Sequence, residues 1–371
     1  MKAGLVIYGS LDTITGGYLY DRKFVEDLRF RGHSVEVFSQ TWRSYPARVL
    51  DNFSAKMLRA IENAQLDLLI EDELNHPSLF RMNRRLQKQM RVPIVSVVHH
   101  LRSSEMRPKW QNTFYRRVER DYLSTVDGFV FNSLTTKASV ETLIGKSKPC
   151  VVAYPGRDNV QPDIASESVM ARSVEPGPLR ILFVGSLIPR KELHTLLVAL
   201  GKLPKESWRL EVVGSPDHDR AYAQRIFDLI AELRLQASVT LLGSLTTAEL
   251  ADRYGANQVL AVPSSYEGFG IVYLEGMGFG LPALASRSGA TGEIITHGQD
   301  GFLVKTGDVD AIASHVEELA RDRARLAKMS LAALDRYAAH PTWSESAASI
   351  TKFFEEVIEG NSFVQRSSPR S

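Results

Sequence analysis

Two glutamates that lie eight positions apart, Glu267 and Glu275, enclose a glycine-containing turn in the sequence Glu-Gly-Phe-Gly-Ile-Val-Tyr-Leu-Glu. The apolar run 258–262 before them predicts a strand, and residues 271–279 predict a helix. Backbone N–H groups around the start of that helix would point outward, where the peptide dipoles favour an anion such as a diphosphate. This spacing therefore suggests a site for a nucleoside diphosphate that carries a sugar.

Each glutamate has its own place in this interpretation. Glu275 lies about 6 Å along the helix axis from the first turn, at ~1.5 Å per residue, which is about the span from a diphosphate to the hydroxyl groups of its ribose. Glu267 lies on the other side of the phosphates, where the sugar would be. The alternative is a surface helix with two solvated glutamates, because charged helix faces are common.

Basic side chains suited to the same phosphates end the turn that follows the predicted strand 180–184. In this turn, Gly185-Ser-Leu-Ile-Pro-Arg-Lys191, the last two residues are Arg190 and Lys191. A lysine offers a point charge to phosphate, and an arginine offers a two-pronged hydrogen-bond donor.

Three further motifs follow the glutamate pair: Gly280-Leu-Pro282, Gly289-Ala-Thr-Gly-Glu293 and an Asp-Gly-Phe-Leu-Val segment that ends at Val304. In this order the motifs resemble those of glycosyltransferase family 4, a family of retaining hexosyltransferases. The resemblance implies the GT-B fold, an α/β architecture of two Rossmann-like doubly wound domains that face each other across a cleft. It also implies transfer of a sugar from a UDP- or GDP-linked donor to an acceptor hydroxyl, with no cofactor.

The resemblance also implies roles for individual residues. Lys191 matches a basic residue that contacts the diphosphate, and Arg190 replaces a second one, since Ser186 stands where the family often has arginine. Glu267 would hold hydroxyl groups of the donor sugar rather than act as a nucleophile. The implied catalytic residues are Glu267, Lys191 and His99. The implied donor-binding residues are Gly16, Gly17, Arg190, Gly214, Leu245, Phe269, Gly270, Ile271, Val272 and Glu275.

Two adjacent histidines, His99 and His100, follow the predicted strand 92–98. Open α/β sheets bind ligands at this edge, but successive side chains of a strand point to opposite sides. Only one of the two can therefore face a site. The family pattern favours His99, six residues after Pro93, and leaves as alternatives His100 or a loop pair with no role.

The order of predicted elements divides the chain into two α/β domains. Residues 1–160 form an acceptor-side domain, 161–178 a linker rich in Asp, Ser, Pro and Glu, and 179–340 the nucleotide-sugar-binding domain. A helix over residues 341–359 crosses back to the first domain, and residues 360–371 form a disordered tail.

Composition agrees with a soluble two-domain protein. The chain has 371 residues, of which 44% are hydrophobic and 24% charged, and it contains no apolar run of the ~20 residues that span a bilayer. We therefore expect a cytoplasmic location and no nucleic-acid partner. The net charge of +2 is uneven, because residues 1–160 hold 24 Lys and Arg against 17 Asp and Glu, whereas the remainder holds 21 against 26.

Two basic stretches, Arg81–Arg91 and Arg102–Arg120, account for much of this positive charge, and aromatic residues lie within the second. Aromatic and basic side chains together favour the surface of an anionic membrane. They suggest a lipid or polysaccharide precursor as acceptor and peripheral attachment at the inner membrane face. The alternatives are a solvated basic face and a soluble small-molecule acceptor.

The segment Asp217-His218-Asp219 has the spacing of a metal-binding D-x-D motif, but it precedes a predicted helix, so we expect it to cap that helix. We expect the reaction to need no metal. A nicotinamide dehydrogenase is excluded because no G-x-G-x-x-G joins the first strand to the first helix. A sugar-nucleotide epimerase and a non-catalytic nucleotide-sugar binder remain as rivals.

Overall fold

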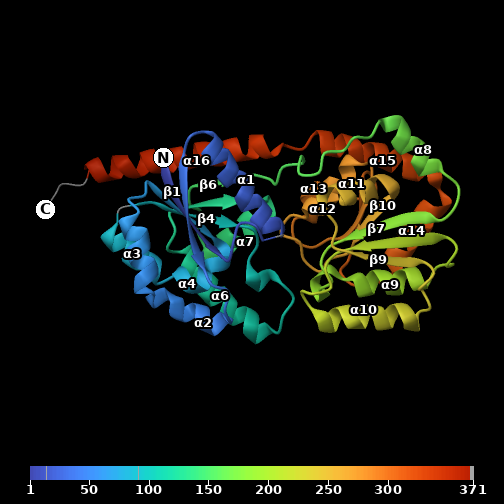
Figure 1. The fold of residues 1–371 in the computed structure, drawn as a ribbon, viewed down its shortest axis with the longest axis horizontal. Helices are drawn as coiled ribbons and strands as arrows, with labels where there is room; N and C mark the ends of the chain where they lie inside the picture. The colour runs from blue at the N-terminus through green and yellow to red at the C-terminus, as the bar shows by residue number, and fades with distance from the viewer. Residues whose placement is uncertain (14, 91, 368–371) are drawn as a thin grey trace. The chain divides into compact units, whose positions relative to one another are not determined.

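The computed structural model describes residues 1–13, 15–90 and 92–367, with no side chains described for 362–367. These residues form two compact units. Unit 1 comprises Met1–Gly156 together with the chain from Pro341 onward, and unit 2 comprises Arg157–His340. Each unit is an α/β fold with a central parallel sheet and helices on both faces (Figure 1).

Unit 1 contains a six-stranded sheet in the order β2-β1-β3-β4-β5-β6, and every neighbouring pair is parallel. The central strands are buried on both faces and mostly apolar, as expected of a sheet covered on both sides. The strands are β1 (Lys2–Tyr8), β2 (Ser34–Gln40), β3 (Leu68–Asp72), β4 (Ile94–Val98), β5 (Gly128–Phe131) and β6 (Cys150–Val152). The helices are α1 (Gly16–Phe30), α2 (Tyr45–Leu50), α3 (Ala55–Asn63), α4 (His76–Leu79), α5 (Met82–Gln89), α6 (Lys109–Leu123), α7 (Leu134–Ile144) and α16 (Trp343–Ser367).

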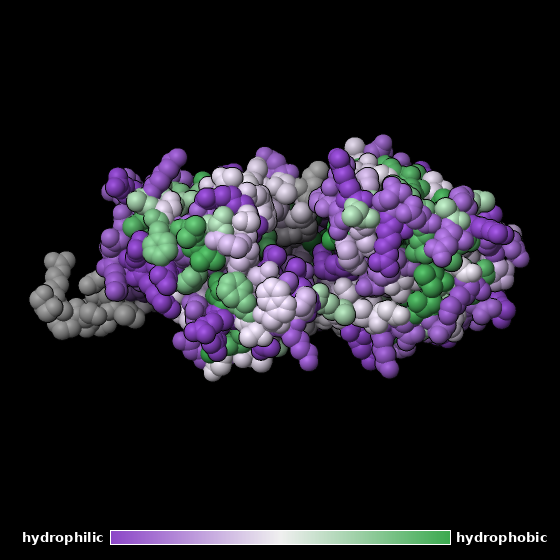
Figure 2. Space-filling view, turned by 90° about the horizontal axis from the view of Figure 1, so that it is seen from below, coloured by the Kyte–Doolittle hydropathy of each residue, from purple (hydrophilic) through white to green (hydrophobic). Residues whose placement is uncertain are grey.

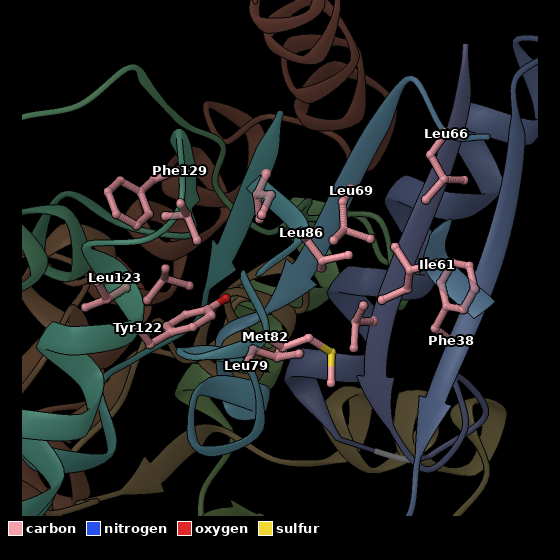
Figure 3. Close-up of a cluster of buried hydrophobic side chains, with 14 of the residues drawn as sticks. Phe38, Ile61, Leu66, Leu69, Leu79, Met82, Leu86, Tyr122, Leu123 and Phe129 are labelled. Carbon is pink, nitrogen blue, oxygen red and sulfur yellow. The ribbon is translucent and has the colours of Figure 1, made fainter. Parts of the chain in front are cut away.

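One face of this sheet packs a cluster of buried side chains against α3, α5 and α6 (Figure 3). Leu69 from β3 lies among Ile61 of α3 and Leu86 of α5, and Tyr122 of α6 is fully buried. The Tyr122 hydroxyl donates a hydrogen bond to Ser96 Oγ at 2.9 Å, so its polar tip has a partner inside the core. Burial of each such apolar side chain contributes about 1.5–3 kcal/mol, which fixes the helices on the sheet.

Helix α16 packs on the other side of unit 1, along α1. The Phe354 ring meets Phe24 edge-on at 6.4 Å, and Trp343 meets Tyr20 at 5.7 Å. Gly156 passes so close to the start of this helix that a Cβ atom there would lie 2.1 Å from the Trp343 nitrogen. The predicted end of this helix at Glu359 was too early, because the helix continues through Ser367. Of the predicted disordered tail, residues 368–371 lie outside the described part.

Unit 2 contains a second parallel sheet, in the order β12-β11-β10-β7-β8-β9. Together with the first sheet it confirms the predicted fold class, two Rossmann-like doubly wound folds. The strands are β7 (Leu179–Val184), β8 (Trp208–Val213), β9 (Val239–Gly243), β10 (Val259–Val262), β11 (Ala283–Ser286) and β12 (Gly301–Val304). The helices are α8 (Ser166–Val174), α9 (Leu193–Gly201), α10 (Arg220–Glu232), α11 (Thr247–Ala256), α12 (Ile271–Gly278), α13 (Thr291–Ile294), α14 (Val309–Arg321) and α15 (Arg323–Ala338).

The predicted linker 161–178 is not a simple linker, because it contains helix α8. Ser173 Oγ of α8 hydrogen-bonds Ser330 Oγ of α15 at 3.0 Å, and Arg172 donates to the carbonyl oxygen of Gly255 at 2.8 Å. The polar composition concealed this helix, since Val169 is its one buried apolar side chain beside the buried Arg172 and Ser173.

Candidate active site

The turn between β10 and α12 has the conformation that its glycines suggest. Gly270 is the N-cap of α12 and has φ of 103°, a left-handed conformation that favours glycine. A Cβ atom at Gly270 would also lie 2.5 Å from the Tyr273 ring. Helix geometry leaves the amides of Ile271 and Val272 without an intrahelical acceptor, so they are placed to bind an anion. The preceding Phe269 is buried against the His340 ring at 5.6 Å.

Glu267 lies at the start of this turn and is bound by both predicted phosphate-binding cations. Lys191 Nζ lies 2.6 Å from Glu267 Oε1, and Arg190 Nη1 lies 3.4 Å from Oε2. Burial disfavours ionisation of Glu267, but Lys191 and Arg190 outweigh it and lower the pKa of its carboxyl to about 2. This group of three charges, which we call the Glu267 cluster, therefore contains a carboxylate that is ionised at neutral pH.

Backbone contacts fix the Glu267 cluster in unit 2. The carbonyl oxygen of Arg190 accepts a hydrogen bond from Ser265 N at 2.8 Å, which joins the two loops that supply the cluster. Gly289 packs directly on Glu267, because a Cβ atom at Gly289 would lie 1.9 Å from the Glu267 carbonyl oxygen. Ala290 N then donates to that oxygen at 2.9 Å. The Gly289 motif thus supports the position of Glu267.

Three strand ends of unit 2 bring the remaining predicted loops side by side. Gly185 follows β7, and a Cβ atom at Gly214, after β8, would lie 1.9 Å from the Gly185 carbonyl oxygen. Gly214 N donates to the Gly243 oxygen at 2.8 Å, and the half-buried Leu245 follows Gly243. Parallel sheets bind ligands beyond the carboxyl ends of their strands, which is where these loops lie.

Glu275 lies in α12 with only 5% of its surface exposed. Its Oε1 accepts a hydrogen bond from Asn159 Nδ2 at 2.7 Å, and its Oε2 accepts one from the Tyr254 hydroxyl at 3.0 Å. Burial raises the pKa of Glu275, and the two hydrogen bonds oppose that rise. Since Glu267 is also only 6% exposed, the interpretation of the two glutamates as solvated surface residues is wrong.

The unit 1 residues of the predicted site form a separate group around His99. A Cβ atom at Gly17 would lie 3.2 Å from His99 Cδ2, so the start of α1 contacts the imidazole directly. Gly16 begins α1, whose N-cap Thr15 accepts a hydrogen bond from Tyr18 N. His99 Nε2 lies 3.2 Å from Oδ1 of the fully buried Asp21, whereas His100 Nε2 pairs with Glu105 at 3.1 Å. The two histidines therefore have different environments.

The charge of His99 follows from its neighbours. Burial lowers the pKa of an imidazole, but Asp21, Asp72 and Glu73 outweigh that effect and raise the pKa of His99 to about 9. The ring is therefore protonated at neutral pH and acts as a hydrogen-bond donor. Asp21 was not predicted from the sequence, and its position one helical turn after Gly17 was the signal available.

Two groups of side chains in the described part of the chain have oxygen and nitrogen atoms close enough to share a cation. One consists of Asp21, Asp72 and His99, and the other of Glu73, His76 and Glu119, with ligand atoms within 4.8 Å of one another in each. Neither group was predicted from the sequence. In the first group His99 is paired with Asp21, with His99 Nε2 3.2 Å from Asp21 Oδ1. The expectation of a metal-free reaction stays a prediction.

The Asp217–Asp219 segment caps a helix, as the sequence predicted. Asp219 is the N-cap of α10 and accepts a hydrogen bond from Tyr222 N at 3.0 Å, while Asp217 pairs with Arg220 at the surface. Neither aspartate belongs to the two groups above.

The predicted basic surface of unit 1 combines cations with exposed aromatic rings. Trp110 is 72% exposed and Phe114 is 50% exposed, both on α6. Arg81 and Arg85 lie over the half-exposed Phe53 ring at 5.5 and 5.4 Å. Figure 2 shows apolar side chains interspersed with hydrophilic ones on the face of unit 1 that carries α2 and α6. Arg91, at the end of the first basic stretch, lies outside the described residues.

None of the helices in the described residues is both long and apolar enough to cross a membrane.

Comparisons with known proteins match each unit to a glycosyltransferase family model. The profile described as "Glycosyl transferases group 1" matches residues 167–336, and the profile described as "Glycosyltransferase Family 4" matches residues 20–160. The chain is 26% identical over 370 residues to a D-inositol 3-phosphate glycosyltransferase from Rhodococcus erythropolis, which covers 89% of this chain and 84% of that protein. It is 28% identical to the GDP-mannose-dependent alpha-(1-6)-phosphatidylinositol monomannoside mannosyltransferase from Mycobacterium tuberculosis, over 64% of each chain.

Among solved structures, the fold is similar to that of Anabaena HepE in complex with UDP and glucose. The TM-score is 0.77 at 18% identity, with 96% of this chain and 100% of that chain covered. This likeness supports the GT-B fold.

Proposed function

This chain belongs to the GT4-type glycosyltransferases, and from that premise we propose that it is a retaining hexosyltransferase that uses a UDP- or GDP-linked sugar as donor. The single observation that supports this most strongly is the Glu267 cluster, which gathers Lys191, Arg190 and an ionised carboxylate beside the N-terminus of α12. Fixed positive charge next to the N-terminal amides of a helix suits a diphosphate that gains negative charge as it leaves.

Each part of the unit 2 site has a role in this proposal. Lys191, Arg190 and the amides of residues 269–272 stabilise the departing diphosphate, and the loops at Gly214 and Leu245 border the nucleoside. Glu275 accepts hydrogen bonds from the ribose. Glu267 orients the two cations and accepts hydrogen bonds from hydroxyl groups of the sugar.

In unit 1, His99 is proposed to donate a hydrogen bond to the donor sugar, with its proton held by Asp21. Gly16 and Gly17 are proposed to bring the first turn of α1 close to the donor. A larger side chain at Gly17 would meet the imidazole. No step of this scheme requires a metal ion, since fixed protein charges and helix amides supply the positive charge.

The choice of donor rests on two relatives. The HepE structure is in complex with UDP and glucose, and the mannosyltransferase relative is described as GDP-mannose-dependent. Neither name decides between the two bases for this chain, so the test uses both.

For the acceptor we propose an anionic molecule, with a membrane lipid or polysaccharide precursor ahead of a soluble small molecule. The relatives' names include an inositol phosphate and a phosphatidylinositol mannoside. The basic and aromatic surface of unit 1 supports attachment of the enzyme at the inner membrane face, because each basic residue contributes about 1 kcal/mol near an anionic membrane.

Co-sedimentation with vesicles tests the membrane part of this proposal. We expect binding to vesicles that contain phosphatidylserine at low salt, release at high salt, and a clear loss of binding in Trp110→Ala/Phe114→Ala. The matched control is Phe227→Ala, which removes a partly exposed ring from unit 2. If wild type does not bind even at low salt, the acceptor is a soluble molecule and the basic stretches are a solvated face.

Turnover tests the main proposal. Purified protein with a panel of UDP- and GDP-sugars and an inositol phosphate or phosphatidylinositol acceptor should release nucleoside diphosphate and form an α-linked product, identified by NMR. Glu275→Ala should weaken nucleotide binding, whereas Glu267→Ala should mainly lower kcat. Equal and small effects of both substitutions on a folded protein would contradict the assigned roles.

Two alternatives give different results in the same assay. An epimerase would convert a labelled donor to its epimer without any acceptor, and a non-catalytic binder would bind the donor without releasing nucleoside diphosphate.

A further inference from the structure

We propose that Asn159, together with Tyr254, is a positioning residue that orients Glu275 for the two ribose hydroxyl groups of the donor. This inference rests on the proposed function, since it concerns how the proposed nucleotide site selects ribose. Asn159 belongs to none of the family motifs in the sequence, and it lies just before the predicted linker 161–178.

Glu275 can accept more hydrogen bonds than Asn159 and Tyr254 supply. An ionised carboxylate accepts about four hydrogen bonds, two at each oxygen. Asn159 Nδ2 uses one position on Oε1 and the Tyr254 hydroxyl uses one on Oε2. One position therefore remains on each oxygen, and two neighbouring ribose hydroxyls can fill them as donors.

The donors to Glu275 are held in place by the surrounding structure. Tyr254 is fully buried in α11 and stacks on Phe279 with ring centroids 5.5 Å apart and an interplanar angle of 22°. Its hydroxyl therefore has little freedom to move away from Glu275. A carboxylate held by two fixed donors on different oxygens cannot rotate without losing a bond, so its open positions point in fixed directions.

The segment that contains Asn159 is itself attached to α15. Two residues earlier, Arg157 donates from Nη1 to the Ala338 carbonyl oxygen at 2.6 Å, and its guanidinium lies 5.7 Å from the centre of the Tyr337 ring. This anchors the segment to the end of α15.

The same ring packs against the helix of Glu275. A Cβ atom at Gly278 would lie 2.8 Å from the Tyr337 ring, so glycine at this position lets α15 approach α12 closely. One packed assembly within unit 2 therefore contains residues 157–159, α15 and α12. Contacts with α15 hold the segment of Asn159 beside the helix of Glu275.

A purely structural link between Asn159 and α12 would predict a different result from a positioning role. A structural link affects stability and all ligands equally. A positioning role affects only ligands that offer ribose hydroxyls to Glu275.

The experiment compares dissociation constants by calorimetry for UDP and GDP and for their 2′,3′-dideoxy counterparts, which lack both hydroxyls. For the nucleotide that wild type binds, we expect the ribose form to bind at least about 10-fold more tightly than the dideoxy form, since a hydrogen bond to a charged group contributes about 1.5–3 kcal/mol. In Asn159→Ala the affinity for the ribose form should fall about 10-fold while that for the dideoxy form is unchanged. Tyr254→Phe, which removes only the hydroxyl, should reduce the same ratio.

The matched control is Gln161→Ala, which removes a neighbouring amide that is exposed and should change neither constant. If Asn159→Ala and Tyr254→Phe both keep the wild-type ratio, the positioning role is wrong while the proposed function stands. If wild type binds neither UDP nor GDP, the proposed function fails and this inference fails with it.

Discussion

Replacing Lys191 with alanine separates the catalytic role of the Glu267 cluster from its structural one. Lys191 Nζ is 2.6 Å from Glu267 Oε1, and both side chains are largely buried. Removal of one partner of a buried ion pair costs about 3–5 kcal/mol, because it leaves the other charge uncompensated. Since Arg190 still lies 3.4 Å from the same carboxylate, we expect a loss near the lower limit, about 3 kcal/mol. Loss of a charge-stabilising donor should also lower kcat about 100-fold or more.

The double variant Lys191→Ala/Glu267→Gln tells these effects apart. It removes both charges, so it should recover about 2 kcal/mol or more of the lost unfolding free energy, measured by urea denaturation. Turnover should stay low, because the diphosphate still lacks its cation and the sugar also lacks the Glu267 carboxylate. The control is Lys202→Ala, which breaks an exposed 2.6 Å pair with Asp310 and should change stability by less than about 0.5 kcal/mol. Recovery of turnover along with stability in the double variant would refute the catalytic role of Lys191.

Three further predictions follow from other parts of the chain. Activity should survive EDTA; complete loss that magnesium or manganese restores would contradict the metal-free scheme. Glu71→Gln should flatten the dependence of stability on pH. Burial raises the Glu71 pKa from 4.5 to about 8. The stability that the protonated form of Glu71 contributes is therefore complete below about pH 4.5 and is lost as pH rises through about 8. Urea denaturation at about pH 5 and about pH 8 checks this, and a wild-type slope that persists in the variant would show that Glu71 is not its source. Gly17→Ala should lower kcat about 10-fold without weakening UDP or GDP binding, because the added methyl group would press on His99. The control is Gly255→Ala, where an added methyl group meets no atom within 4 Å. Equal kcat in both variants would exclude the contact between Gly17 and His99 from catalysis.

The pH prediction has a structural basis in unpaired atoms. Asn83 Nδ2 donates to Glu71 Oε2 at 2.9 Å, while Glu71 Oε1 and Asn83 Oδ1 are buried without a partner. A buried carboxylate with an unpaired oxygen is costly, and protonation of Glu71 removes its charge. The neutral carboxylic acid is therefore the form that the folded unit 1 prefers.

Much of the fold could be predicted from the sequence, because parallel strands covered on both faces are continuous apolar runs. The predicted strands 180–184, 209–213 and 258–262 differ from β7, β8 and β10 by one residue at most at each end. Helix α8 could not be predicted in this way, since Ser166–Val174 buries few apolar side chains.

The candidate site was predictable where local geometry determines it. Gly270 has the positive φ and the close contact that its place in the motif suggests, and Arg190 and Lys191 lie at the turn that the strand end predicts. Partners that come from distant parts of the chain left no local signal. The contacts of Asn159 with Glu275 and of Asp21 with His99 join residues 116 and 78 positions apart. Sequence periodicity reports only neighbours along one helix or strand, so it cannot predict such pairs.

The central claim is that unit 2 holds a nucleoside-diphosphate sugar at Glu275 and the Glu267 cluster. Thermal unfolding of wild type and Glu275→Ala in the presence of UDP-, GDP- and ADP-sugars tests it most directly, because a ligand that binds only the folded state adds about 2.7 kcal/mol at 100 times its Kd. We predict that Tm rises with concentration for the sugars of one nucleotide, and that Glu275→Ala needs at least about 10-fold more ligand for the same rise. If none of these sugars raises Tm at any concentration, or if Glu275→Ala responds as wild type does, the assignment of the donor site is contradicted.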